Sequence, residues 1–272
     1  MNCTICTPVP ETPRSTLDNA HKMPGHWLLA SLGKRVLRPG GLELTRTMLD
    51  RLDIQPRDSV VEFAPGLGVT ARLTLSRQPK DYTAIERDET AAAEVRSYLR
   101  GSNQRCLIGS ADQIVLPDET ATVVYGEAML TMQGPEQKRR IVGEAFRLLK
   151  SGGRYGIHEL SLTPDDLPQN VKDDISHEMS HSIHVGARPL TTREWRELLE
   201  GAGFKVQAEA VAPMHLLEPR RLIRDEGFLR ALRFVFNVIR KPAARQRVLS
   251  MRRVFRKHRN HLAAIAIVAV KP

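Results

Sequence analysis

The sequence has few cysteines, no long apolar run and no secretory pattern at its start. Its 272 residues include only 3 cysteines, Cys3, Cys6 and Cys106, which are too few for a disulfide framework and suit a reducing compartment. No apolar run approaches the roughly 18–20 residues that a membrane-spanning helix needs. The first residues are polar and rich in proline and threonine, without the basic start and apolar stretch of a signal peptide. We therefore expect a cytoplasmic protein.

Cys3 and Cys6 form a lone Cys-x-x-Cys pair. A structural zinc site needs four ligands, and no second ligand pair accompanies this one. We therefore expect no metal at this position.

Short β-rich runs alternate with stretches of helical periodicity between about residues 42 and 159. The predicted strands are Ser59–Phe63, Tyr82–Glu86, Arg105–Gly109, Ala121–Tyr125 and Arg154–Glu159, followed later by Phe204–Val211 and Leu262–Val270. A helix is predicted at Thr192–Gly201, capped by Thr191 or Thr192. The alternation predicts an α/β, Rossmann-like fold with a mostly parallel sheet between two layers of helices.

A glycine-rich turn, Glu62-Phe63-Ala64-Pro65-Gly66-Leu67-Gly68, follows the first predicted strand. Glycines allow a ligand to approach the backbone closely, and the following helix offers free N–H groups to an anionic group. About 20 residues later Glu86 ends the second strand, where a carboxylate can accept hydrogen bonds from two ribose hydroxyls. The pattern predicts a site for a nucleoside-containing cofactor.

Two cofactors fit this pattern, and Glu62 separates them. Gly66-x-Gly68-x-x-Ala71 matches the dinucleotide fingerprint, but a carboxylate at the mouth of the first strand would oppose a pyrophosphate. The same carboxylate suits the ammonium of the methionyl group in S-adenosylmethionine. We therefore expect S-adenosylmethionine rather than a nicotinamide cofactor.

Four stretches resemble successive motifs of the class I methyltransferases: VVEFAPGLG, the acid of TAIERDE, GSADQIVLPDETATVVYGEAML and AFRLLKSGGRYGIHEL. They are similar to the ubiquinone/menaquinone C-methyltransferase and sterol methyltransferase group. The resemblance covers residues 41–159, with a weaker echo in LTTREWRELLEGAGF. It implies a seven-stranded sheet with an antiparallel last strand, and methyl transfer from S-adenosylmethionine.

The resemblance also implies which residues bind the cofactor: Glu62, Ala64, Gly66, Gly68, Glu86, Arg87, Ser110, Ala111, Asp112, Glu127 and Ala128. The turn would line the methionyl end, Glu86 would hold the ribose, and Glu127 would face the methyl-transfer centre. Two positions depart from the family pattern, because Ala64 stands where glycine is usual and Ser110 where an aspartate commonly contacts the adenine. The chain also lacks the Asn/Asp-Pro-Pro-Tyr/Phe motif, which argues against methylation of the amino group of a DNA base or a glutamine.

Three histidines share one face of a predicted helix. His177 and His181 belong to an HExxH sequence, and His184 follows one turn later. A zinc protease would need a different fold context, so we expect no metal here. We expect His177 and His181 to line the substrate pocket, with His184 or His158 as general base, and a solvated polar helix face is the alternative.

The chain divides into an N-terminal tail and cap helix (1–40), a core (41–217), a basic helical insertion (218–261) and a last core strand (262–272), all within one domain. His26 and Trp27 of the cap, together with Met129, are expected in the substrate pocket, with simple packing against the core as the alternative for the cap.

The basic insertion carries most of the charge of the chain. The net charge is +10, and residues 218–261 contain 14 lysines and arginines against 3 acidic residues. Leu222, Leu229, Leu232, Phe236 and Ile239 fall near one helix face. The insertion could wall the substrate pocket, lie on an anionic membrane surface or bind RNA, and we rank these interpretations in that order.

The expected function is methyl transfer from S-adenosylmethionine to a small hydrophobic or aromatic acceptor. Two alternatives stay open: methylation of RNA or protein through the basic segment, and a non-catalytic regulator that binds S-adenosylmethionine or a metal.

Overall fold

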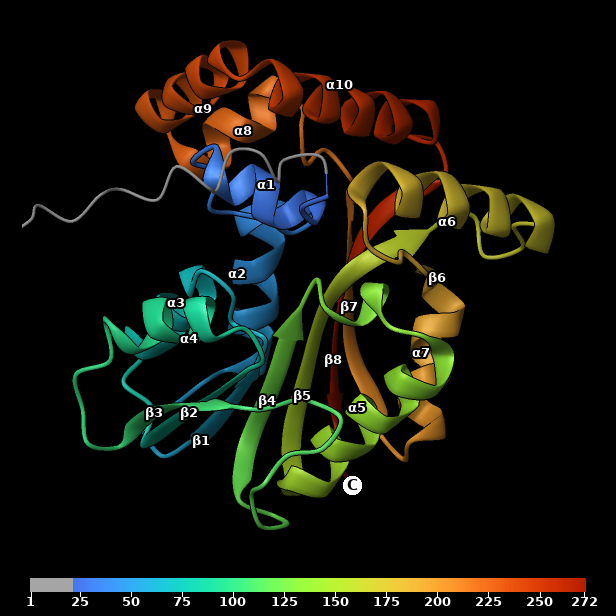
Figure 1. Cartoon of the computed structure of the whole chain (residues 1–272). Helices are drawn as coiled ribbons and strands as arrows, with labels where there is room; N and C mark the ends of the chain where they lie inside the picture. The colour runs from blue at the N-terminus through green and yellow to red at the C-terminus, as the bar shows by residue number, and fades with distance from the viewer. Residues whose placement is uncertain (1–21) are drawn as a thin grey trace, which may run out of the picture.

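A mostly parallel, eight-stranded sheet runs through the middle of the protein (Figure 1). The structure is a computed structural model that describes residues 22–272. The strands are β1 (Ser59–Phe63), β2 (Asp81–Glu86), β3 (Gln104–Ile108), β4 (Ala121–Glu127), β5 (Leu149–Leu162), β6 (Leu190–Thr191), β7 (Lys205–Pro213) and β8 (Leu262–Val270). Their order is β3-β2-β1-β4-β5-β8-β7, with β6 beside β5, and β8 runs antiparallel to both of its neighbours. The predicted fold class is therefore confirmed, with the short β6 as an additional strand.

Helices cover both faces of this sheet. On one face lie α2 (Gly41–Leu52), α3 (Val69–Leu75) and α4 (Glu89–Arg96), and on the other α5 (Pro135–Leu148) and α7 (Thr192–Gly201). Each face has its own cluster of buried apolar side chains. Removing this apolar surface from water stabilises the layered arrangement.

Two local features show how the sequence sets element boundaries. Thr191 caps α7 in a capping box, because its hydroxyl accepts from the Glu194 N–H while the Glu194 carboxylate accepts from the Thr191 N–H. The glycines at 152 and 153, just before the predicted strand Arg154–Glu159, lie inside β5 at an irregularity in its pairing with β4. Leu149 pairs with Ala121 before it and Arg154 with Val123 after it.

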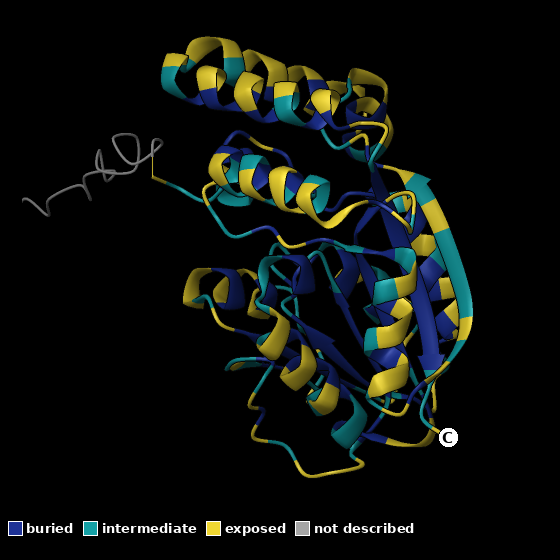
Figure 2. Ribbon diagram, turned by 90° about the vertical axis from the view of Figure 1, so that its right-hand side faces the viewer, coloured by how far each residue is buried: buried dark blue, intermediate teal, exposed yellow. Residues whose placement is uncertain are grey.

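A further layer of helices lies beyond the carboxyl ends of the parallel strands (Figure 1). It consists of α1 (Gly25–Ser31), α6 (Gln169–Ile183), α8 (Pro219–Glu226), α9 (Phe228–Arg240) and α10 (Pro242–Lys257). A third buried apolar cluster joins these helices to the end of β5. Figure 2 shows that the outer surface of this layer is largely exposed. Within the described residues no helix is long and apolar enough to cross a membrane.

Candidate active site

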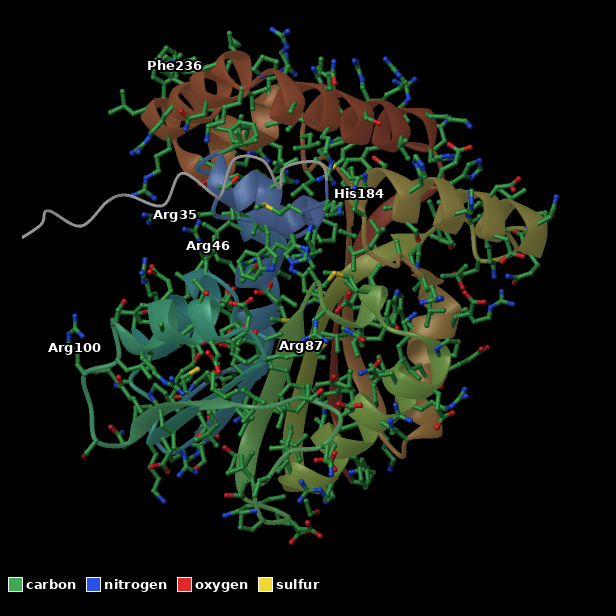
Figure 3. The ribbon with its side chains drawn as sticks, in the orientation of Figure 1. Arg35, Arg46, Arg87, Arg100, His184 and Phe236 are labelled. Carbon is green, nitrogen blue, oxygen red and sulfur yellow. The ribbon has the colours of Figure 1, made fainter. Side chains whose placement is uncertain are left out.

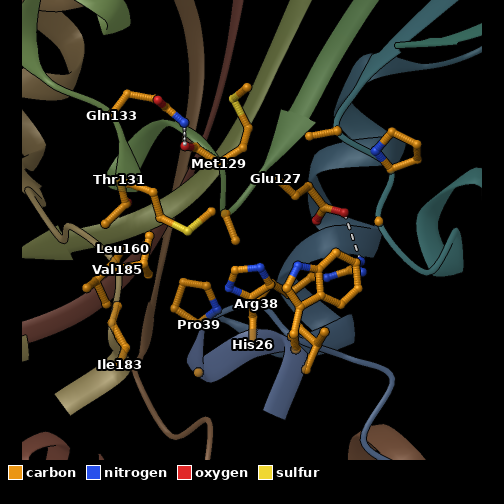
Figure 4. Close-up of a pocket in the computed structure, with 18 of the residues that line it drawn as sticks. His26, Arg38, Pro39, Glu127, Met129, Thr131, Gln133, Leu160, Ile183 and Val185 are labelled. Atoms are coloured by element: carbon orange, nitrogen blue, oxygen red, sulfur yellow. Dashed lines mark hydrogen bonds and ion pairs between the residues drawn. The ribbon is translucent and has the colours of Figure 1, made fainter. Parts of the chain in front are cut away.

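A cavity of about 430 Å³ lies where β1, β2 and β4 end, beneath the outer helical layer (Figure 4). In an open α/β sheet the crevice at the carboxyl ends of the strands, where the strand order reverses, is the usual ligand site. Here that point falls between β1 and β4, because the chain continues from β1 to β2 on one side and to β4 on the other. The sheet topology therefore creates the cavity.

The glycine-rich turn after β1 forms one wall of the cavity. Ala64 and Gly66 line it and have positive φ values of 50° and 55°. A Cβ added to Gly66 would meet no atom within 4 Å, so the space beside this residue is open to a ligand. Gly68 also has a positive φ, but it does not line the cavity, and a Cβ there would collide with the Tyr98 hydroxyl. Of the two expected glycines, the structure thus brings only Gly66 to the cavity.

Glu62 is the penultimate residue of β1 and lines the cavity wall beneath the turn. It is 3% exposed, and its Oε2 accepts hydrogen bonds from the hydroxyls of Tyr82 and Tyr125 on the two neighbouring strands. Burial raises the pKa of Glu62 to about 7, although the two tyrosine hydrogen bonds act in the opposite direction. Its Oε1 accepts no hydrogen bond from residues 22–272, so this oxygen can receive one from a ligand.

Glu86 ends β2 and lines the cavity beside the turn. Its Oε1 accepts from the N–H groups of Arg87 at 2.8 Å and Asp88 at 3.0 Å, and its Oε2 accepts from the Gly66 N–H at 3.0 Å. These bonds hold the carboxylate at the cavity edge and fix the turn relative to β2. The cavity thus offers a rigid acidic acceptor at the position where the sequence predicted one.

The expected adenine-side residues only partly reach the cavity. Arg87, Ser110 and Ala111 line it, whereas Asp112 does not. Asp112 instead accepts a hydrogen bond from Ser110 and lies 3.6 Å from the Arg140 guanidinium. The Ser110 hydrogen bond and the nearby Arg140 help to lower the pKa of Asp112. Asp112 therefore holds the Ser110 side chain through this hydrogen bond without lining the cavity itself.

Glu127, at the end of β4, is the centre of a buried polar network (Figure 4). Its Oε2 accepts from the Arg38 guanidinium at 2.8 Å and from Thr70, and its Oε1 accepts from Thr45 at 2.5 Å. Despite burial, these partners and His158 lower the pKa of Glu127 to about 2. Arg38 also lines the cavity, and sequence reasoning did not single it out because one arginine in a basic stretch carries no motif.

His158 completes this network, and the structure places it away from the expected role of general base. Its ring is fully buried: Nε2 accepts from the Gly40 N–H at 3.1 Å, and Nδ1 lies 2.8 Å from Glu127 Oε1. Because Nε2 accepts the hydrogen bond from the Gly40 N–H, Nε2 carries no hydrogen. The ring hydrogen is therefore on Nδ1, which donates a hydrogen bond to Glu127. His158 therefore orients Glu127, and neither ring nitrogen is free to take a proton from a substrate.

Glu159, the next residue of β5, shapes the loop that follows β4. Its buried carboxylate accepts from the N–H groups of Met129, Leu130 and Thr131 and from the Thr131 hydroxyl, at 2.7–3.0 Å. The loop contains the 3-10 turn η2 (Leu130–Met132), and Ala128 and Met129 at its start line the cavity. Glu159 thus positions the expected pocket residue Met129 without reaching the cavity itself.

The histidines of α6 do not line the cavity, contrary to expectation. His177 and His181 lie on α6, and His184 caps its end with a positive φ of 56° (Figure 3). Glu178 of the HExxH sequence instead binds Lys257 and His258 of the insertion. Among residues 22–272 no group of three metal-ligating side chains comes together, and the Cys3–Cys6 pair lies outside the described residues. The α6 side chains that do reach the cavity are Met179 and Ile183.

The N-terminal cap contributes His26 and Trp27 to the cavity wall, as expected. The two rings lie against each other with centroids 5.1 Å apart. Burial lowers the pKa of His26, and the nearby Arg87 lowers it further. The outer helical layer and the end of β5 add a mainly apolar lining, together with the polar Arg35, Thr131, Gln133 and Gln137. The apolar residues are Leu29, Leu37, Leu160, Met179, Ile183, Val185, Met214, Leu216, Met251 and Phe255. The cap, the basic insertion and α6 were all predicted to reach the substrate pocket. The insertion contributes Met251 and Phe255 of α10 to the cavity, and α6 contributes Met179 and Ile183 in place of the predicted histidines.

Comparisons with known proteins agree with the geometry. Residues 61–157 match the methyltransferase domain family. An uncharacterised protein of Haemophilus influenzae is 30% identical over 251 residues, which are 91% of this chain and 98% of the relative. The chain belongs to the class I S-adenosylmethionine-dependent methyltransferase family.

Solved structures share the fold of this methyltransferase. Phosphoethanolamine N-methyltransferase 2 of Haemonchus contortus in complex with S-adenosyl-L-methionine has a TM-score of 0.69 at 14% identity, over 91% of this chain and 57% of that one. The cyclase SpnF has a TM-score of 0.65 at 17% identity, over 85% and 81% of the two chains. Because the shared fold includes a cyclase, the acceptor of this methyltransferase has to be argued from its own cavity.

Proposed function

We propose that this methyltransferase transfers a methyl group from S-adenosylmethionine to a small acceptor that is mainly apolar or aromatic. The observation that carries the proposal is the division of the cavity into two ends. Polar groups of Glu62, Gly66 and Glu86 line the end formed by β1 and β2, and the side chains that α1, α6, α10 and the end of β5 contribute to the other end are mainly apolar. A polar cofactor and an apolar acceptor would each meet matching surface.

The residues of the polar end fit S-adenosylmethionine. The open space beside Gly66 admits a ligand close to the backbone, and Glu62 Oε1 is available to the ammonium of the methionyl group. Glu86 would accept from the ribose hydroxyls, with Ser110 and Ala111 at the adenine. When bound, S-adenosylmethionine supplies an electrophilic methyl group on a sulfonium.

The protein contributes mainly by positioning. Glu127 accepts hydrogen bonds from Arg38 and from His158, and both ring nitrogens of His158 are engaged, so neither residue can accept a proton from the acceptor. Alignment of the cofactor with the acceptor, and exclusion of water by the helical layer, can supply much of the rate enhancement of a displacement reaction. This arrangement favours an acceptor atom that is already nucleophilic. An acceptor molecule that carries its own basic group to take up the proton would also fit.

A cavity enclosed by helices also favours a small molecule over a macromolecular acceptor. The apolar end is bounded by Met179 of α6, Met251 and Phe255 of α10 and Leu29 of α1. A protein or RNA acceptor would have to insert one residue or base through this layer. We therefore place small molecules first, with RNA or protein as the alternative that an acceptor screen tests.

Calorimetric titration with S-adenosylhomocysteine tests the cofactor. Micromolar binding is expected, with a loss of at least tenfold in Glu86→Ala and in Gly66→Val, because the valine side chain would occupy the open space beside the turn. Val115→Ala, a change at a side chain that is 94% exposed, is the matched control and should bind normally. Binding of NADH in place of S-adenosylhomocysteine would refute the assignment. Formation of S-adenosylhomocysteine in a screen of apolar, polar and RNA acceptors then tests the acceptor class.

A further inference from the structure

The outer helix α9 exposes a continuous apolar stripe. Eight of the 11 exposed large apolar side chains in residues 22–272 lie between Ile223 and Leu249. Those on α9 are Phe228, Leu229, Leu232, Val235, Phe236 and Ile239, with exposures of 44–78%. Phe236 lies on the outermost surface of the helical layer (Figure 3). Single exposed apolar residues are common on proteins, but a row of six on one helix points to a surface that is covered in use.

The periodicity of α9 separates three faces. At about 100° per residue, the six exposed apolar side chains fall within an arc of about 120°. Arg230, Arg233 and Arg240 are exposed and follow directly on one side of this arc. On its other side, Ala231 and Phe234 are buried and anchor the helix to the apolar cluster of the outer layer. The stripe is therefore held outward and is bordered by arginines.

The insertion carries a large excess of positive charge, because residues 218–261 contain 14 lysines and arginines against 3 acidic residues, and each of these three carboxylates already accepts hydrogen bonds or forms ion pairs. Glu226 accepts from the N–H groups of Arg35 and Val36, and Asp225 accepts from the Leu42 N–H. Glu218 pairs with two arginines of α10 at 3.2 and 3.4 Å. Arg230, Arg233 and Arg245, in contrast, form no ion pair with any residue in 22–272. The outer surface therefore offers free positive charge beside the apolar stripe.

We propose that the outer surface of α9 docks onto an anionic lipid bilayer. An exposed apolar arc bordered by arginines is the pattern of a helix that lies in the bilayer interface, with apolar side chains among the acyl chains and cations at the headgroups. RNA would use the arginines but would leave the stripe in water. A second copy of this chain would cover the stripe but would bring two strongly positive surfaces together. Of these three occupants, only the bilayer satisfies both features.

The docked orientation has a structural link to the cavity. The buried face of α9 packs in the same apolar cluster as Leu29, Met251 and Phe255, which line the apolar end of the cavity. The bilayer would thus lie on the side of the molecule from which an apolar acceptor would come. Docking does not depend on the proposed methyl transfer, and it can be tested without turnover.

The test is flotation of the full-length protein with vesicles. Vesicles of phosphatidylcholine with about one-third phosphatidylglycerol should carry the protein upward, and vesicles of phosphatidylcholine alone should carry much less. Arg230→Gln/Arg233→Gln should weaken binding about 25-fold, because each basic residue near an anionic surface contributes about fivefold. Leu232→Asn/Phe236→Asn should weaken it at least tenfold. The control Val115→Asn/Arg100→Gln makes the same kinds of change on exposed side chains away from α9 and should bind like the wild type.

Folding of the variants is checked by S-adenosylhomocysteine affinity, which should be unchanged because none of the substituted residues lines the cavity. The proposal is overturned if all three variants float with anionic vesicles as well as the wild type does. The same conclusion follows if the wild type does not float with these vesicles at about 0.1 M salt. It is also overturned if the two α9 variants lose binding to a single-stranded RNA probe while vesicle binding persists. Dimerisation of the wild type by light scattering that only the apolar variant abolishes, without vesicle binding, would assign the stripe to a second copy.

Discussion

Lowering the pH from about 8 to about 6 is expected to weaken binding of S-adenosylhomocysteine about tenfold, through protonation of Glu62. The pKa of this residue is about 7 in the free protein. The ammonium of the methionyl group pairs only with the ionised carboxylate. Glu62 is about nine-tenths ionised at pH 8 and one-tenth at pH 6, which sets the tenfold difference, or about 1.4 kcal/mol.

The surroundings of Glu62 explain why its pKa is raised. Burial is the dominant cause, and the negative charge of Glu127 adds to it. The hydroxyls of Tyr82 and Tyr125 and the charge of Arg38 act in the opposite direction but do not compensate. Both tyrosines stay neutral in this range, because burial raises their pKa values well above 10.

The same group should make the free protein less stable as the pH rises. Because the folded pKa of Glu62 is raised above the ordinary value of 4.5, its contribution to stability is complete below about pH 4.5 and is lost as the pH rises to about 7. The full loss corresponds to about 3 kcal/mol. S-adenosylhomocysteine should offset it, so the ligand should raise the melting temperature more at pH 8 than at pH 6.

Calorimetry of the wild type and Glu62→Gln across this pH range is the assay. The glutamine keeps the size of the side chain but cannot ionise, so its affinity should be weak and should lose this pH dependence. His26 also lines the cavity, and any protonation of it affects both proteins alike. A tenfold change that persists in Glu62→Gln would show that another group controls binding and would refute the reasoning.

Three further changes test the structural roles assigned above. Gly68→Ala should lower the free energy of unfolding by about 1–3 kcal/mol in urea melts, because the new methyl group collides with Tyr98, and a normal stability would contradict this. Arg38→Met should cost about 3–5 kcal/mol by leaving the buried Glu127 without its cation, and the loss should shrink below about pH 4 as the carboxylate accepts a proton. Glu159→Gln should cost about 1.5–3 kcal/mol and weaken cofactor binding, because an amide cannot accept all four hydrogen bonds that hold the loop after β4. An unchanged free energy of unfolding and an unchanged cofactor affinity would show that Glu159 does not hold that loop.

Local patterns were sufficient to predict seven of the eight strands of the sheet, all except the short β6. The boundaries of β1 and β8 agree with the predicted Ser59–Phe63 and Leu262–Val270, and α7 and its Thr191 cap are also as predicted. These elements are set by apolar periodicity and capping, which act over a few residues. The strand β5 was predicted too short, because its first residues pair with β4 across an irregularity that only the assembled sheet reveals.

The site was predicted less completely, because its decisive contacts join distant segments. Arg38 meets Glu127 across 89 positions, and His158 meets Gly40 across 118. Nothing near these residues in sequence marks the partnership. Gly68 shows the opposite case: its place in a motif suggested contact with the cofactor, whereas the structure gives it a packing reason, the ring of Tyr98.

The position of β8 has a consequence for how the chain reaches its native state during synthesis. This strand comprises residues 262–270 yet lies between β5 and β7, and within the sheet β7 pairs only with it. Until residues 262–270 have emerged from the ribosome, β5 keeps an open edge and β7 lacks this partner. The sheet therefore cannot close before β8 is available, and nascent chains depend on protection of that edge until this strand inserts.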